Sequence, residues 1–153
     1  MVDAAEIVSL HDKLNLLWHS ETAQSVGAKA VSGSAWLQAV ERQHRANFDL
    51  WHIEDEARTP GASDSDLASV KRRIDRTNQL RNDLAEQLDI FLLDWLGPQS
   101  LPRPEAALHS ESPGLIIDRL SILALKMFHT REEATRAGAP QGPAQRNRQR
   151  LTI

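Results

Sequence analysis

Apolar residues recur at helical spacing along nearly the whole chain, and this periodicity restricts the fold more than any other feature. No run alternates apolar and polar residues as a half-buried strand does, and β-branched residues are scarce. Turn-rich stretches divide the pattern into four predicted helices, at about residues 4–19, 34–58, 63–96 and 113–136. The sequence therefore predicts an all-α fold.

Helix stop signals define the connections between these segments. Pro60 and Gly61 end the second helix, and Gly97-Pro98 ends the third, which would be about 50 Å long at 1.5 Å per residue. The short connection after the second helix forces an antiparallel pairing of the second and third helices. With the other two added, we predict an antiparallel four-helix bundle with a long central helical hairpin.

One domain accounts for most of the chain, since 153 residues suffice for a single hydrophobic core. We place this domain at residues 1–138 and a flexible basic tail at residues 139–153. The tail has no apolar period, and it carries Arg146, Arg148 and Arg150 but no acid. We expect it to be disordered, as segments of this composition usually are.

Composition and charge exclude several classes of protein. The chain has no cysteine, which rules out disulfides, zinc–thiolate sites and iron–sulfur clusters. A net charge of −3 does not indicate a nucleic-acid partner, and the basic patch at residues 71–76 has acidic neighbours. The most apolar stretch, residues 88–96, is far shorter than the roughly 20 residues that span a bilayer. Since the first residues also lack a secretion-signal pattern, we expect a cytoplasmic protein without membrane insertion.

Polar residues interrupt the core-facing stripes of the second and third helices. Equal counting from a turn centre near residue 61 places Asn47 opposite Asp75 and His44 opposite Asn78. Burying such groups unpaired costs about 1–3 kcal/mol each, so they must pair, hold water or bind a ligand. We call this feature the polar seam, and its candidate ligand-binding residues are His44, Asn47, Glu54, Asp55, Arg58, Lys71, Asp75, Asn78, Arg81, Asn82, Asp118 and Arg119.

Three interpretations of the polar seam stay open at this point. It is a buried hydrogen-bonded network that fixes helix register, or it is the pocket of a binding or accessory protein. In the third interpretation it is an active site with His44 as the general base, oriented by Asn78 or Asp75. A binding pocket would suit a small anionic ligand, because four cations are close in the pattern: Arg58, Lys71, Arg81 and Arg119.

A metal-dependent hydrolase that cleaves phosphoanhydrides is the alternative function. Helical enzymes of this kind hold Mg²⁺ with carboxylate pairs from two helices. The second helix carries Glu54, Asp55 and Glu56, but not at the required spacing, and the hairpin count places them far from Asp83 on the third helix. There is no Glu-x-x-His motif, and His52 beside its acidic neighbours is a weak metal pair. We therefore predict no metal site and leave the cofactor open.

Three long runs carry a family resemblance. They are NFDLWHIEDEAR at residues 47–58, KRRIDRTNQLRNDLAEQLD at 71–89 and DRLSILALKMFH at 118–129. Together they resemble a bacterial all-helical domain family of unknown function, with the motifs NFxLWxxEDxAR, KRxIDxxNQxRND and DRLSILxLK. The resemblance implies no activity or catalytic residue. Members of that family are often encoded near sugar-transferase genes, so the resemblance implies a role in bacterial surface-glycan metabolism.

The end of the third helix has more apolar surface than one core-facing stripe requires. Ile90, Leu93 and Leu96 lie on the flank of that stripe, where water would meet them. We predict that this flank forms a homodimer. The alternative is that residues 98–112 fold back and cover it.

Overall fold

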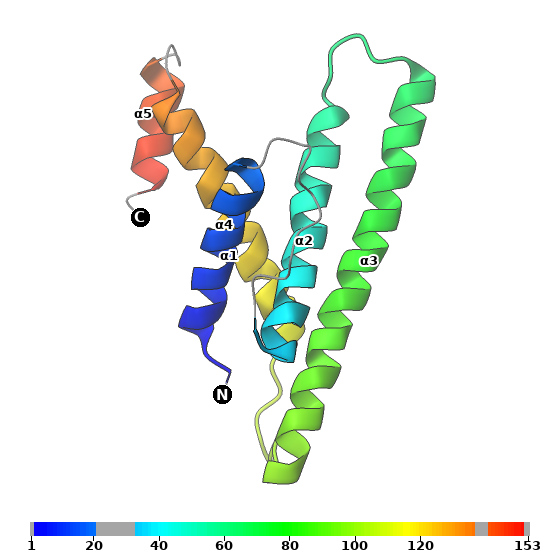
Figure 1. Cartoon of the computed structure of the whole chain (residues 1–153), viewed down its shortest axis with the longest axis vertical. Helices are drawn as coiled ribbons and strands as arrows, with labels where there is room; N and C mark the ends of the chain where they lie inside the picture. The colour runs from blue at the N-terminus through cyan, green and yellow to red at the C-terminus, as the bar shows by residue number, and fades with distance from the viewer. Residues whose placement is uncertain (1, 21–32, 137–140, 152–153) are drawn as a thin grey trace.

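The structure is a computed structural model that describes residues 2–20, 33–136 and 141–151. In these ranges it contains five α-helices and one short 3₁₀ helix, and no strand, which confirms the all-α prediction (Figure 1). The elements are α1 (Ala4–Ser20), α2 (Ala35–Glu56), α3 (Asp64–Leu96), η1 (Gly97–Gln99), α4 (Pro113–Thr135) and α5 (Gln141–Arg150).

Side-chain caps explain where the long helices begin. The hydroxyl of Ser34 accepts a hydrogen bond from the Leu37 N–H at the start of α2. Ser63 and Asp66 form a reciprocal capping box at the start of α3. Ser112 caps α4, with proline at the first helical position.

Helices α2 and α3 form the expected antiparallel hairpin, and α4 runs antiparallel to α3 (Figure 1). In contrast, α1 and α2 run in the same direction, so the arrangement is not antiparallel throughout. Short connections force antiparallel neighbours, but the stretch between α1 and α2 is long enough in residues to return along the bundle. As a result, α1, α2 and α4 all point their C-terminal ends toward the same side.

The tail prediction was wrong for residues 141–150, which form α5 rather than a disordered segment. Helix α5 packs beside α4 (Figure 1). The guanidinium of Arg148 approaches the carbonyl oxygen of Ala134 in the last turn of α4, where a cation is favourable. Glutamine and arginine are good helix formers, and this contact gives them a surface to order against.

The core lies between α1, α2, α4 and the second half of α3. Within α3, only residues from the second half are buried, whereas its first half lies along α2 alone (Figure 1). The core side chains are Ile7, Leu10, Leu14, Trp18, Trp36, Ala39, Val40, Phe48, Leu88, Leu92, Ile117 and Leu125.

Gly114 allows α4 to begin directly against α3. A Cβ atom at this position would overlap the carbonyl oxygen of Ala85. The Gly114 N–H also donates a hydrogen bond to Asp89 Oδ1 at 2.7 Å, so Asp89 satisfies a free donor in the first turn of α4. This close crossing fixes where the next turn of α4, which carries Asp118, meets α2 and α3.

The far end of α3 keeps apolar side chains in contact with solvent. Ile90 is 52% exposed and Leu93 is 55% exposed. The connection at residues 98–112 does not cover them, since its own Leu101 and Leu108 are also exposed. None of the helices described here has the combination of length and apolar composition needed to cross a membrane.

Candidate functional site

The carboxylate of Asp118 is the centre of a buried group of hydrogen-bonded side chains. We call this group the polar cluster, and it consists of Asn15, Gln43, His44, Asn47, Arg81, Asp118 and Ser121. Asp118 is 4% exposed and accepts hydrogen bonds from Gln43 Nε2 at 2.6 Å and Asn47 Nδ2 at 2.9 Å, both from α2. Arg81 of α3 donates two more, from Nε at 2.8 Å and from Nη2 at 2.7 Å. This bidentate pairing raises the pKa of Arg81, and the charge of Glu54 adds to the effect. The carboxylate therefore ties α2, α3 and α4 together.

A second set of hydrogen bonds extends the cluster to α1. His44 Nε2 is 3.1 Å from Asn15 Oδ1, and His44 Nδ1 is 2.7 Å from Ser121 Oγ. Since an amide oxygen only accepts, His44 donates from Nε2 and accepts the Ser121 hydroxyl proton at Nδ1. Ser121 Oγ in turn accepts from Asn47 Nδ2 at 2.9 Å. Together with the bonds to Asp118, these hydrogen bonds link α1, α2, α3 and α4, although Asn15 Nδ2 and Gln43 Oε1 are buried without a partner among the described residues.

The imidazoles of His44 and of its neighbour His11 are both neutral near pH 7. Burial lowers the pKa of His44 from 6.5 to about 2, helped by the neighbouring imidazole of His11. Burial lowers the pKa of His11 from 6.5 to about 4. The two rings stack with centroids 4.4 Å apart, and neither His11 nitrogen has a hydrogen-bond partner. His44 is therefore too weak a base to take a proton near neutral pH.

The structure brings together four of the predicted seam residues and disperses the rest. His44, Asn47, Arg81 and Asp118 form the cluster, and Asn78 lies at its edge, 3.4 Å from Arg81 Nη1. The other candidates are exposed, and they are Glu54, Asp55, Arg58, Lys71, Asp75, Asn82 and Arg119.

The predicted pairing of Asn47 with Asp75 and of His44 with Asn78 was wrong. Equal counting places Glu56 opposite residue 66, but Glu56 forms an ion pair with Arg73, further along α3. The reason is that the first turns of α3 extend past the end of α2 (Figure 1). Equal counting requires that α2 end and α3 begin at the same level. Because they do not, the residues of α3 that face α2 lie further along the chain than predicted.

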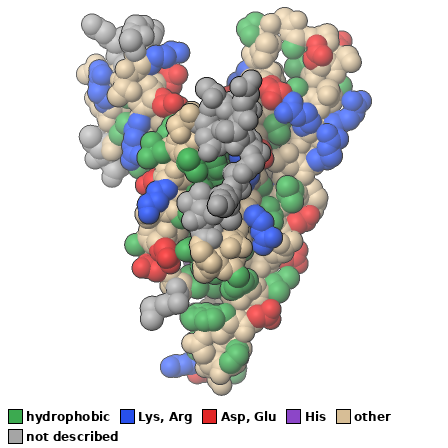
Figure 2. Space-filling view, viewed as in Figure 1, with side chains coloured by type: hydrophobic (Ala, Val, Ile, Leu, Met, Phe, Trp, Pro, Cys, Tyr) green, Lys and Arg blue, Asp and Glu red, His purple; other side chains and the backbone are tan. Residues whose placement is uncertain are grey.

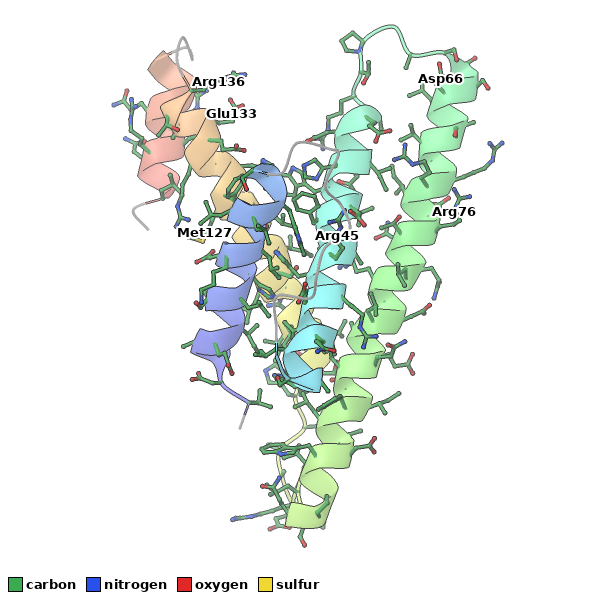
Figure 3. The ribbon with its side chains drawn as sticks, in the orientation of Figure 1. Arg45, Asp66, Arg76, Met127, Glu133 and Arg136 are labelled. Carbon is green, nitrogen blue, oxygen red and sulfur yellow. The ribbon has the colours of Figure 1, made fainter. Side chains whose placement is uncertain are left out.

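The cations expected to bind an anion are each paired with a carboxylate. Arg81 binds Asp118, as described, and Arg119 pairs with Glu111. Arg58 pairs with Asp55 at 2.6 Å, and Lys71 pairs with Asp75 at 2.6 Å. Basic side chains gather over the first half of α3, interspersed with acidic ones (Figure 2), and Arg76 lies on its outer face (Figure 3). Among the described residues, this leaves no strong concentration of positive charge at the seam.

The carboxylates of the hydrolase alternative are likewise engaged at separate places. Glu56 binds Arg73, Asp83 accepts from Gln79 at 2.7 Å, and Asp89 caps α4. Within the ranges that the structure describes, no three of these carboxylates come within metal-ligand distance of one another.

An open pocket of about 300 Å³ lies at the end of the bundle where α1 and α2 begin and α3 ends. Its described walls are mostly apolar and aromatic, with Trp36 and Phe91 ring centroids 5.4 Å apart. No basic side chain is among the described lining residues. We call it the aromatic end pocket, and it is lined by Val2, Glu6, Ser34, Trp36, Phe91, Leu92 and Trp95.

Three histidines meet toward the opposite end of the bundle. Each comes from the C-terminal half of a different helix, α1, α2 or α4. They are His19, His52 and His129, all half-buried, with one ring nitrogen of each within 4.8 Å of the others. Burial lowers the pKa of His19, and the nearby His129 and His52 lower it further. We call this group the histidine triad.

The histidine triad and two members of the polar cluster, Asn15 and Gln43, were not predicted from the sequence. Asn15 and Gln43 are polar residues on otherwise core-facing helix stripes, the same signal that identified His44. The triad joins residues from three helices with no sequence motif among them, so only the directions of those helices reveal it. Ser121 of α4 also belongs to the cluster, through the hydrogen bond between its hydroxyl and His44.

Fold and cluster together define an all-α bundle whose helices are joined by a buried network of hydrogen-bonded polar side chains. The chain belongs to the DUF4254 family, described as a protein of unknown function, whose model matches residues 37–153. That range contains the three motif runs, so the predicted membership in a helical family of unknown function is confirmed. No curated protein and no solved structure matches the chain.

Proposed function

We propose that the protein is a helical binding or accessory protein whose ligand occupies the aromatic end pocket. The observation that carries the proposal is the pocket itself, an open cavity of about 300 Å³ walled by Trp36, Phe91 and Trp95. Small-molecule sites are concave, mostly apolar and aromatic, with a few polar groups. Glu6 and Ser34 supply those polar groups here.

A binding role fits the rest of the described chain better than catalysis. The polar cluster, the best candidate for an active site, has its charges paired internally, and its imidazole has a pKa far below neutral. General bases work best when their pKa is near the operating pH. The cluster therefore serves as a structural network, and no specific observation favours the hydrolase alternative.

The lining favours a neutral ring compound. Indole and phenyl faces pack against apolar ring faces, while the Glu6 carboxylate accepts hydrogen bonds from hydroxyl groups. A sugar ring has both features. Binding of a sugar would agree with a role in bacterial surface-glycan metabolism. We place this role in the cytoplasm, as the sequence led us to expect. An anionic ligand is less suited to the pocket, because the one charged residue among its described walls is an acid.

We also propose that the protein forms a homodimer through the apolar flank next to this pocket. Ile90 and Leu93 supply exposed apolar side chains on the flank of α3. A two-fold contact over this flank would bury them in a self-complementary surface.

Isothermal titration calorimetry with a panel of methyl pyranosides tests the binding proposal, with UDP-glucose as the anionic comparison. We expect saturable binding of at least one neutral sugar, weakened about tenfold or more by Trp95→Ala, since about 1.4 kcal/mol of lost contact is a factor of ten. Leu80→Ala is the matched control, because Leu80 is an exposed apolar residue of α3 away from the pocket. No binding by the panel, or equal binding by Trp95→Ala, would overturn the proposal.

A further inference from the structure

The histidine triad has the hydrogen-bonding arrangement of metal ligands. His19 Nδ1 is 2.7 Å from the Asn15 carbonyl oxygen, and His52 Nδ1 is 2.8 Å from the Phe48 carbonyl oxygen. Both oxygens only accept, so each imidazole carries its proton on Nδ1 and leaves Nε2 with a free lone pair. Metal-binding histidines are held in this way, with the second ring nitrogen donating to a carbonyl or carboxylate.

The third histidine follows the same pattern with a carboxylate. His129 Nδ1 is 3.0 Å from Glu132 Oε2, one turn later on α4. The Nε2 atoms of His129 and His19 are buried and have no hydrogen-bond partner among the described residues. Unpartnered buried atoms also occur around the polar cluster. The two nitrogens here differ because the proton of each ring is already placed on Nδ1, so each Nε2 presents a lone pair that a ligand could accept.

Aromatic packing holds the three imidazoles in place. The His129 ring stacks on Trp51 with centroids 4.8 Å apart, and the His19 ring stacks on Phe128 at 4.1 Å. Phe48 contacts His19 edge-on and lies 4.3 Å from His52, centroid to centroid. The apolar surroundings restrict ring rotation, and they lower the competition from water for a bound ion.

We propose that His19, His52 and His129 bind one divalent transition-metal ion, with Zn²⁺ as the best fit. Imidazole is a preferred ligand of Zn²⁺, Cu²⁺ and Ni²⁺, whereas Mg²⁺ and Ca²⁺ prefer oxygen. Zinc–nitrogen bonds of about 2.0–2.1 Å place tetrahedral ligand atoms about 3.3 Å apart, so nitrogens now within 4.8 Å need only small side-chain rotations. Three protein ligands leave a fourth position open to water or a ligand.

This site is independent of the aromatic end pocket, since it joins the C-terminal ends of α1, α2 and α4 (Figure 1). A bound ion would cross-link three helices whose C-terminal ends share one side of the bundle. The competing interpretation is an aromatic cluster without an ion, stabilised by ring contacts alone. The two differ in one measurable property, which is stoichiometric metal affinity that depends on all three histidines.

The test uses the full chain without an affinity tag, freed of metal with EDTA and dialysed. Calorimetric titration with ZnCl₂ is expected to give one ion per chain. Each of His19→Gln, His52→Gln and His129→Gln is expected to weaken binding by more than about tenfold, and Glu132→Gln by about tenfold. His109→Gln is the matched control, because His109 is exposed on the connection before α4 and lies outside the triad. Helical circular dichroism verifies that each variant is folded.

A second measurement needs no substitution. Co²⁺ added to the unmodified protein is expected to give the intense visible absorption bands of tetrahedral nitrogen coordination, and Zn²⁺ is expected to abolish them. Absence of stoichiometric Zn²⁺ binding would overturn the proposal. Binding that persists in all three histidine variants, or octahedral Co²⁺ spectra with weak bands, would overturn it as well.

Discussion

Arg81 holds the buried carboxylate of Asp118 with two parallel hydrogen bonds, 2.8 Å from Nε and 2.7 Å from Nη2. The pair connects α3 to α4 across the bundle, and two α2 amides complete the coordination of the carboxylate. The side chain of Asp118 is 6% exposed and that of Arg81 is 25% exposed, so the pair is only partly open to water. Removing one partner leaves a buried charge without its counter-charge, which costs more than removing both.

Replacement of Arg81 by Met is therefore expected to be strongly destabilising. The free energy of unfolding should fall by about 3 kcal/mol, measured by urea denaturation. The double variant Arg81→Met with Asp118→Leu should lose less than the sum of the two single variants. Additive losses would show that the two groups do not act as a pair.

Acid should destabilise the protein through its two buried imidazoles. In the unfolded chain both histidines have a pKa near 6.5, while in the fold His11 has a pKa of about 4 and His44 of about 2. The unfolded state therefore binds more protons below pH 6.5. Stability is fully present above that pH and falls by about 1.4 kcal/mol per pH unit for each histidine as pH decreases toward 4.

Replacement of His11 by Leu should remove one of these contributions. His11 has no hydrogen-bond partner, so its loss leaves no other group unpaired and should be neutral or stabilising at pH 6. The slope of unfolding free energy against pH between 6 and 4.5 should decrease by about 1.4 kcal/mol per pH unit. An unchanged slope, judged against His109→Gln, would contradict the burial argument.

Gly114→Ala should destabilise the contact between α3 and α4. The added methyl group overlaps the Ala85 carbonyl oxygen, and we expect a loss of about 1–3 kcal/mol in thermal or urea unfolding. Gly97→Ala is the control, because nothing lies within 4 Å of a Cβ there and its backbone is helical. A neutral Gly114→Ala variant would mean that α4 approaches α3 less closely.

The proposed homodimer makes a separate prediction. Light scattering at micromolar concentration should give about twice the chain mass of 17.1 kDa. Leu93→Glu should shift the protein to monomer with unchanged helical circular dichroism, because a buried carboxylate in the interface is costly. A monomer in the unmodified protein would contradict the proposal.

The local sequence signals were sufficient for the helices but not for their arrangement. Caps such as Ser63 and stops such as Gly97 act within a few residues, so helix boundaries were predictable. The α2–α3 register and the parallel course of α1 and α2 depend on packing between distant residues, which periodicity does not report. The same limit explains the partial success at the seam: His44 and Asn47 were identified as buried polar residues, whereas their partners Asn15 and Ser121 come from other helices.

The short basic α5 shows a different limit. Composition predicted disorder for the tail because it lacks an apolar face, and the order observed at residues 141–150 comes from contact with α4. The contact between Arg148 and the C-terminal end of α4 depends on the folded bundle, so the sequence of the tail alone does not predict it.

The proposed function requires that a small molecule bind in the aromatic end pocket while the polar cluster serves only as a structural network. The four tryptophans distinguish these sites. Trp36 and Trp95 line the pocket, and Trp18 stacks on His44 of the polar cluster. Trp51 stacks on His129 of the histidine triad and serves as a reference. The decisive measurement is the ¹H–¹⁵N NMR spectrum of the indole N–H groups during titration with the tightest-binding methyl pyranoside. We expect the Trp36 and Trp95 signals to shift while those of Trp18 and Trp51 stay in place. Shifts of Trp18 alone, or no shift at saturating sugar, would contradict the proposed function.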